Sequence, residues 1–285
     1  MATPSDPLQL LAAAVAAPAD SQQQADLLAT LRESLEAHPQ PLPILCTHLV
    51  KTVSAPGDSL LKRWVLDLLQ YAICRAPLPV ETRTQLASQS LEVLAGLLND
   101  PNPATVKVVV QTFATVYPLL FRYLCMNRNA RQQWDILAYS KARILEFVHA
   151  AGTSAGVRLA AVKFMQRVIL VQTRGIADPR LQNKNDPNLS MCPADHPFIP
   201  AAALEAEGVK LLEAIITMLY SNKNPNILSA IINSWSNLIK LRPGLVQIVI
   251  STLTSWTPHF LVGLPYNSIR SVEKAIRILL LHISR

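Results

Sequence analysis

Apolar residues recur at helical spacing along almost the whole of this chain. After Thr105 they follow the i, i+3, i+4, i+7 order of a helix that is buried on one side, at Val106, Val109, Val110, Phe113, Tyr117, Leu120 and Leu124. Alternation of β-branched and polar residues is rare, and glycine is scarce at 8 residues, which argues against sheet. The pattern predicts an all-α fold. Its helices are expected over 8–17, 21–37, 43–54, 58–75, 80–98, 103–125, 130–150, 155–172, 201–220, 225–241, 243–256 and 266–284.

A short unit also repeats, in which an apolar residue and a basic residue precede an apolar run. It occurs at Leu61-Lys62, Val106-Lys107, Val157-Arg158 and Ile269-Arg270, and without the basic residue at Ile227-Leu228. The units are 45, 51, 70 and 42 residues apart, which brackets the two-helix repeat of HEAT and armadillo proteins. We therefore expect a HEAT/ARM-type α-solenoid arc of about 5–6 helix pairs in one domain, 1–285. Such rods bind macromolecules and rarely catalyse reactions.

Residues near the predicted helix ends suggest where each helix starts. Asp58, Asn102, Ser154, Asn224 and either Asn267 or Ser268 stand at expected N-cap positions. Pro118 lies within an apolar stripe and predicts a kink or a break there.

Residues 173–200 interrupt the helical rhythm with turn residues and mixed charge. A loop of this length within a helical array is uncommon, and is often functional or disordered. It ends in Asp195-His196-Pro197-Phe198-Ile199. We expect Asp195 to position the start of the next helix, and Phe198 and Ile199 to pack down as a hydrophobic staple.

The net charge of +7 is unevenly distributed. Residues 1–100 carry a balance of −4, residues 101–185 a balance of +9 and residues 186–285 a balance of +2. The middle third is therefore the expected surface for an anionic partner, which could be an acidic protein, a phosphorylated peptide or RNA. The alternative is that these charges are solvated outer faces of helices.

Motifs for catalysis and cofactors are missing or incomplete. The chain has no G-x-x-x-x-G-K-[ST], no G-x-G-x-x-G and no H-E-x-x-H. Cys125 and Arg131 have the C-x5-R spacing of cysteine phosphatases, but no glycine lies between them and Cys125 ends an apolar helix. Cys192 and His196 lack further metal ligands. We expect no enzyme activity, no cofactor and no metal, with Cys125 in the core.

Three further observations limit the possible location and partners. No apolar stretch approaches 18 uninterrupted residues, so a membrane span is not expected. The start of the chain lacks the basic residues of a signal peptide, so an intracellular protein is expected. Aromatic residues fall on the predicted apolar stripes, which places them in the core rather than on an RNA-stacking surface: Phe113, Tyr117, Trp134, Phe164 and Trp235.

Short stretches at 153–170 and 193–245 resemble the N-terminal HEAT domain of symplekin, a scaffold of the pre-mRNA 3′-end cleavage and polyadenylation machinery. They include the run from Gly156 to Phe164, Asp195-His-Pro-Phe-Ile199, Glu207-Gly208 and Ser236 to Pro243. Ser271-Val272 fits as well, and the high Ala, Gln and Pro content is typical of a filamentous-fungal member.

The resemblance implies a nuclear, non-catalytic scaffold that forms the N-terminal part of a longer protein. Its helical domain would bind and stimulate a phosphatase of the RNA polymerase II C-terminal repeat, and other cleavage and polyadenylation subunits would be further partners. The lysine of the family's V-R-x-x-A-[IV]-K-F motif is Lys163 here. The basic residues expected at the partner surface are Lys163, Arg158, Lys107, Arg167 and Lys240. Arg270 and Lys274 continue this row of cations.

Two other functions remain open at this point. A direct RNA-binding solenoid would use the basic middle third. An armadillo-type peptide or transport adaptor would need a ladder of Asn and Trp residues, of which only Asn233 and Trp235 are present.

Overall fold

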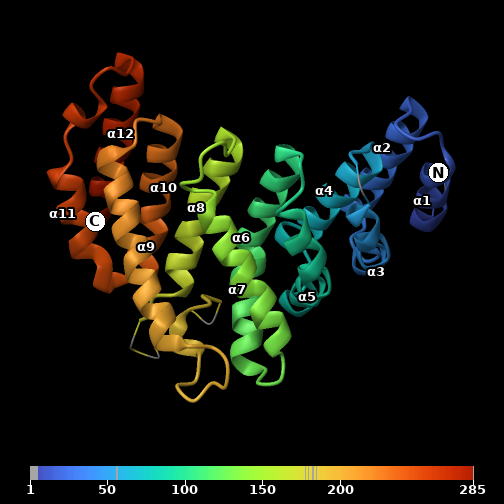
Figure 1. Cartoon of the computed structure of the whole chain (residues 1–285), viewed down its shortest axis with the longest axis horizontal. Coiled ribbons are helices and arrows are strands. Elements are labelled where there is room, and N and C mark those ends of the chain that lie inside the picture. The colour runs from blue at the N-terminus through green and yellow to red at the C-terminus, as the bar shows by residue number, and fades with distance from the viewer. Residues whose placement is uncertain are drawn as a thin grey trace. The chain divides into compact units, whose positions relative to one another are not determined.

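The computed structural model of the chain describes residues 6–55, 57–176, 178, 180–181, 183 and 185–284 (Figure 1). These residues form α-helices and short 3-10 helices, and no strand occurs among them. The α-helices are α1 (Pro7–Ala16), α2 (Gln22–Ala37), α3 (Leu42–Leu49), α4 (Leu60–Cys74), α5 (Val80–Leu97), α6 (Pro103–Met126), α7 (Arg131–Glu146), α8 (Ala155–Val171), α9 (Ala201–Ser221), α10 (Pro225–Leu241), α11 (Val246–Ser255) and α12 (Tyr266–Ile283). The 3-10 helices are η1 (Val50–Ser54), η2 (Leu189–Met191), η3 (Pro243–Leu245) and η4 (Pro258–Leu261). The prediction of an all-α, solenoid-like fold is confirmed.

The chain divides into two compact units. Unit 1 comprises Met1–Leu120 and Asp135–Arg143, and unit 2 comprises Phe121–Trp134 and Ile144–Arg285. The division runs through α6 and α7, because each of these helices contributes residues to both units. The expectation of a single domain over 1–285 therefore stays a prediction.

In unit 1 the helices α1 to α4 each pack on the next helix, on the next but one, or on both. In it α1 packs on α2, α2 on α4, and α3 on both α4 and α5. Unit 1 also contains a nearly buried ion pair, in which Lys62 Nζ lies 2.9 Å from Asp100 Oδ2. The Lys62 ammonium also donates hydrogen bonds to the carbonyl oxygens of Ala55 and Gly57. Lys62, a basic residue of the recurrent unit, is thus structural.

Unit 2 repeats this arrangement, with α10 packed against both α8 and α12. The helices α8, α9 and α10 lie side by side in Figure 1. Phe164 of α8 and Trp235 of α10 are buried in its core. The α9 helix approaches the end of α8 closely at Gly208. A Cβ on this residue would lie only 2.8 Å from the carbonyl oxygen of Gln172, so the approach requires glycine.

The α6 helix continues through Pro118, so a break at this residue is wrong, while the expected kink stays a prediction. By length and composition, α6 is long and apolar enough to cross a membrane. This corrects the expectation that no segment of the chain is apolar enough to do so. However, 56% of its most apolar window is buried inside the protein, where Phe113, Tyr117 and Leu120 have no solvent contact or almost none. These contacts identify α6 as a core helix.

Three of the expected caps are confirmed. Ser154 accepts the N–H of Val157, Asn224 accepts that of Asn226, and Asn102 accepts that of Ala104. Two are wrong. The α4 helix is capped by Ser59 rather than Asp58, because Asp58 instead pairs with Arg63. The α12 helix starts at Tyr266, as its expected span does, but the residue before it is Pro265, without a side-chain cap; Asn267 and Ser268 lie inside the helix, two and three residues after the cap position.

The loop after α8 is fastened by two groups of contacts. Asp186 binds Arg242 at 2.6 Å, and this guanidinium, only 2% exposed, also donates to Thr173 Oγ1 and to the carbonyl oxygen of Leu170. At the other end, Asp195 binds Arg128 at 2.7 Å, and buried His196 lies 3.0 Å from the carbonyl oxygen of Leu124.

The expected role of Asp195 at the start of α9 is therefore wrong, since Arg128 takes its carboxylate and lowers its pKa, while Pro200 precedes the helix. Ile199 is buried, and Phe198, half-buried, packs edge-on against His196 at 4.5 Å. The expected packing of these two residues is confirmed.

Candidate partner-binding groove

The α8 helix presents two cations beside a buried stripe. Ser154 starts the helix by accepting the N–H of Val157. Lys163 and Arg167 lie one turn apart and are exposed. Each residue of the stripe that the sequence predicts is buried: Val157, Ala161, Val162, Phe164, Met165, Val168 and Ile169. The cationic heads therefore reach solvent while their stems cover apolar surface.

The α10 helix presents a polar stripe next to these cations. Asn233, Asn237 and Lys240 recur at i, i+4 and i+7 and are exposed. The opposite side of the helix is buried, and includes Trp235, 1% exposed. Helix α10 thus separates an apolar face for the core from an uncharged amide stripe that ends in a lysine.

A groove of about 400 Å³ runs between α8 and α10. Its lining combines the two cations of α8 with amide and hydroxyl groups of α10: Lys163, Gln166, Arg167, Ile169, Leu170, Asn233, Ser234, Trp235, Ser236, Asn237 and Leu238. No carboxylate lines it among the described residues. Its volume is within the range of sites that hold a ligand or the side chains of a partner.

Gln166 gives the groove a hydrogen-bonding group without a partner. The side chain is 7% exposed, and its Nε2 lies 3.4 Å from the carbonyl oxygens of Val162 and Ala230. Its Oε1 is buried and has no hydrogen-bond donor within the described part of the chain. Because an unsatisfied buried acceptor is unfavourable, a donor from a bound partner would be stabilised here.

The acidic residues are segregated away from the helices that carry the predicted cations. All residues of α6, α8 and α10 are described, and none is Asp or Glu. The neighbouring α9 helix, in contrast, holds Glu205, Glu207 and Glu213. Lys163 and Arg167 repel each other slightly at i, i+4, with no carboxylate on their helix to offset this. The groove therefore favours an anionic ligand.

The structure brings together some of the predicted site residues. Lys163 and Arg167 line the groove, and Lys240 continues the exposed stripe of α10. Arg158 lies outside the lining, because its guanidinium donates to the carbonyl oxygen of Ala150 at 2.9 Å. Lys107 is exposed on the part of α6 that belongs to unit 1.

Sequence reasoning missed Gln166 and Asn237. The seven-residue spacing from Asn233 through Asn237 to Lys240 is visible in the sequence and could have identified the polar stripe. The orphaned oxygen of Gln166 depends on α10 packing against α8, and no sequence pattern reports it.

The Cys125 environment is unsuited to phosphatase chemistry. Burial raises the pKa of this thiol well above its ordinary range, and the thiol of Cys192 nearby raises it further. A nucleophilic cysteine needs the opposite shift. Arg128, within the C-x5-R segment, is engaged by Asp195. Cys125 is 1% exposed, which confirms its expected place in the core.

The aromatic residues expected in the core are confirmed there. Phe113, Tyr117, Trp134, Phe164 and Trp235 are all buried. None of them can stack on a nucleic-acid base from this position. Among the described residues, no cluster of three or more His, Cys, Asp or Glu side chains could hold a metal ion.

The packed helices define an all-α, solenoid-like protein, and the groove between α8 and α10 is its candidate binding site. The chain belongs to the symplekin/PTA1 N-terminal family, whose model matches residues 102–285. It is 29% identical over 243 residues to the mRNA cleavage and polyadenylation specificity factor complex subunit pta1 of Schizosaccharomyces pombe. The alignment covers 83% of this chain but 36% of that protein, so the chain spans about a third of its relative's length.

Proposed function

We propose that this chain is a non-catalytic nuclear scaffold module of the mRNA 3′-end cleavage and polyadenylation machinery. Its family, and the name of the fission-yeast relative as a subunit of the cleavage and polyadenylation factor complex, support this role. Other subunits of that complex would be among its partners.

The module binds, and stimulates, a phosphatase of the RNA polymerase II C-terminal repeat through the groove between α8 and α10. The observation that carries this step is the exposed pair Lys163 and Arg167 in a groove without carboxylates. An acidic segment of the phosphatase would meet Lys163 and Arg167, while Asn233 and Asn237 would take its main-chain groups. Such a fixed array of cations contributes orientation and on-rate as well as affinity.

Lys240, Arg158 and Lys107 have supporting roles in this proposal. Lys240 lies on the same stripe of α10 as the groove asparagines and extends its positive charge. Arg158 and Lys107 are outside the groove lining and would act through long-range attraction, which salt screens.

The test is isothermal titration calorimetry of the whole chain against the phosphatase, with Lys163→Ala as the main variant. Binding should weaken by about 2 kcal/mol, roughly 30-fold, because the partner's carboxylate is left unpaired. Lys210→Ala on α9 is the matched control, since Lys210 is also exposed and lies outside the groove. Both variants should melt like wild type, because exposed charges contribute little to stability.

A second measurement tests stimulation. The chain should accelerate release of phosphate from a phosphorylated C-terminal-repeat peptide by the phosphatase, and Lys163→Ala should need a higher concentration for the same effect. Wild-type affinity of Lys163→Ala, or a sharp drop of its melting temperature, would refute the assignment. Tight binding of single-stranded RNA that falls steeply with salt, by about 0.7 in log K per log unit of salt for each phosphate neutralised, would favour the RNA-binding alternative instead.

A further inference from the structure

A second hollow, of about 460 Å³, lies in unit 2 at the end of α6, away from the groove just described. Its walls come from the last turns of α6, the loop after α8 and the end of α10. They include Arg122, Met126, Gly175, Asn188, Met191 and Leu241. None of these residues lines the groove between α8 and α10.

Arg122 provides an unpaired positive charge in this hollow. The residue is half-buried, and no carboxylate among the described residues pairs with it. Its own helix contains no acidic residue. Asp186 also lines the hollow, but both oxygens of its carboxylate already accept hydrogen bonds from Arg242, at 2.6 and 3.3 Å.

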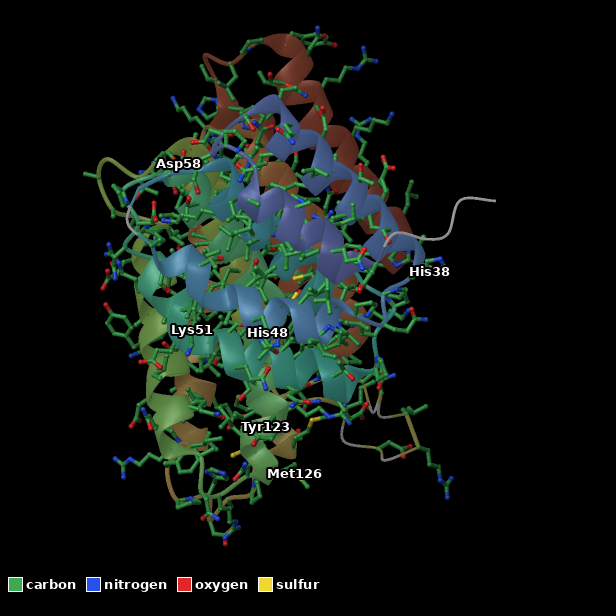
Figure 2. All side chains as sticks on the ribbon, turned by 90° about the vertical axis from the view of Figure 1, so that its right-hand side faces the viewer. His38, His48, Lys51, Asp58, Tyr123 and Met126 are labelled. Atoms are coloured by element: carbon green, nitrogen blue, oxygen red, sulfur yellow. The ribbon has the colours of Figure 1, made fainter. Side chains whose placement is uncertain are left out.

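Apolar side chains form a further part of the lining, beside the polar groups of the loop. Met126 is 80% exposed, which is unusual for so large an apolar residue, and Tyr123, on the same turn but outside the lining, is 38% exposed. Figure 2 shows Tyr123 and Met126 close together at the end of α6. Met191 and Leu241 are half-buried in the opposite walls. Methionine is adaptable and polarizable, which suits a surface that accepts different apolar side chains.

The loop wall is held in place by its own hydrogen bonds. The side-chain oxygen of Asn188 accepts the N–H groups of Gly175 and Ser190, at 3.2 and 3.0 Å. A Cβ on Gly175 would lie 2.8 Å from Asn188 Nδ2, so glycine allows this close approach. The hollow is therefore built by specific contacts between the start and the end of the loop.

From these observations we infer that the hollow is a docking site for a short peptide segment of another protein. The segment carries a carboxylate beside a large apolar side chain: the carboxylate pairs with Arg122, and the apolar side chain packs on Met126, Met191 and Leu241. Charge complementarity argues for this occupant, because a purely apolar segment would leave Arg122 half-buried and unpaired. This site is independent of the proposed phosphatase interface.

The test uses an array of synthetic 12-residue peptides on a Gly-Ser background. Each contains one Glu and one Leu, Phe or Met, one to four positions apart, and has a matched analogue with Gln in place of Glu. Peptides that bind the whole chain better than their Gln analogues are then measured by fluorescence anisotropy. Arg122→Gln should weaken binding at least tenfold, Arg122→Lys should retain part of it, and Met126→Ser should weaken it severalfold.

Arg167→Gln in the other groove is the matched control and should bind these peptides like wild type. Arg122→Gln, in turn, should bind the phosphatase normally. If Arg122→Gln melts early, Met126→Ser decides the result, because Met126 is too exposed to support the core. The inference is overturned if no Glu peptide binds better than its Gln analogue, or if Arg122→Gln and Met126→Ser bind like wild type. Equal loss in the Arg167 control, or Arg122-dependent binding of an RNA oligonucleotide alone, would also overturn it.

Discussion

At the scale of single residues, the buried thiols connect the packing of the protein to its pH dependence. Cys46 of α3 is 2% exposed, and burial raises its pKa to about 12 despite the opposing field of Arg32. In the unfolded chain a cysteine titrates near about 8.5. The folded protein therefore keeps a proton that the unfolded chain releases in alkaline solution.

This difference predicts an alkaline loss of stability in a defined window. The contribution of Cys46 is fully present below pH about 8.5, and declines as pH rises toward 12, by up to about 1.4 kcal/mol per pH unit. Cys46→Ala removes the titration but leaves a small cavity, so it should be the less stable protein at pH 7. Urea unfolding at pH 7, 9 and 10 should show the gap between variant and wild type closing. A gap that stays constant up to pH 10 would contradict the prediction.

The residues that sequence reasoning placed correctly are those whose role follows from helical periodicity. The buried stripe of α8 and the exposure of Lys163 and Arg167 are of this kind. Asp195 was misplaced because its partner, Arg128, is 67 residues away in the sequence. The Arg242–Asp186 pair, 56 residues apart, was missed for the same reason. Polar partners are selected by tertiary proximity, which a local pattern does not report.

At the scale of the element, helix boundaries were predictable because start and stop signals act locally. The α8 and α10 helices begin where Ser154 and Asn224 cap them, as expected. Asp58 failed as a cap because the adjacent Ser59 takes the cap position of α4, which only one residue can occupy, whereas Asn267 failed because α12 already starts after Pro265. The break expected at Pro118 did not occur, because α6 is held along its length by buried side chains such as Phe113 and Phe121.

Two helical glycines give a direct test of helix packing. Replacing a helical Gly with Ala stabilises the helix by about 0.5–1 kcal/mol when the new methyl group meets nothing. At Gly96 of α5 a Cβ would have open space, so Gly96→Ala should raise the melting temperature. At Gly208 of α9 the Cβ would lie 2.8 Å from a backbone oxygen of Gln172, so Gly208→Ala should instead destabilise the protein by about 1–3 kcal/mol.

Thermal melts of the two variants and wild type test both predictions: the melting temperature should rise for Gly96→Ala and fall for Gly208→Ala. Gly208→Ala should also loosen the bond from Gln172 Nε2 to Glu207, now 2.7 Å, because α9 must move away from α8. If both alanines stabilise the protein equally, the close approach of α9 to α8 is wrong.

At the scale of the whole molecule, the periodic pattern predicted the fold class, and repeat spacing predicted a solenoid rather than a single core. The sequence pattern could not predict how the helix contacts divide into compact units, because the strength of packing between neighbouring helices depends on the fit of their side chains. The division into two units that share α6 and α7 is a result of this kind.

The shared helices lead to a prediction about cooperativity. The boundary between the units crosses α6 between Leu120 and Phe121 without interrupting the helix, and helix formation is itself cooperative. Unfolding one unit would fray a helix that the other needs. We therefore expect a single unfolding transition for the chain, as for one domain.

Trp64→Phe makes this expectation testable within one protein. Trp64 belongs to unit 1 and donates to the carbonyl oxygen of Leu28 at 2.9 Å, whereas Trp134, Trp235 and Trp256 belong to unit 2. In the variant, fluorescence reports unit 2 alone, circular dichroism reports all helices, and the lost hydrogen bond weakens unit 1 selectively. Coincident urea midpoints, both lower than in wild type, are expected if the units are coupled. A fluorescence midpoint that stays at the wild-type value, while circular dichroism shows an earlier step, would mean that the two units unfold as separate domains.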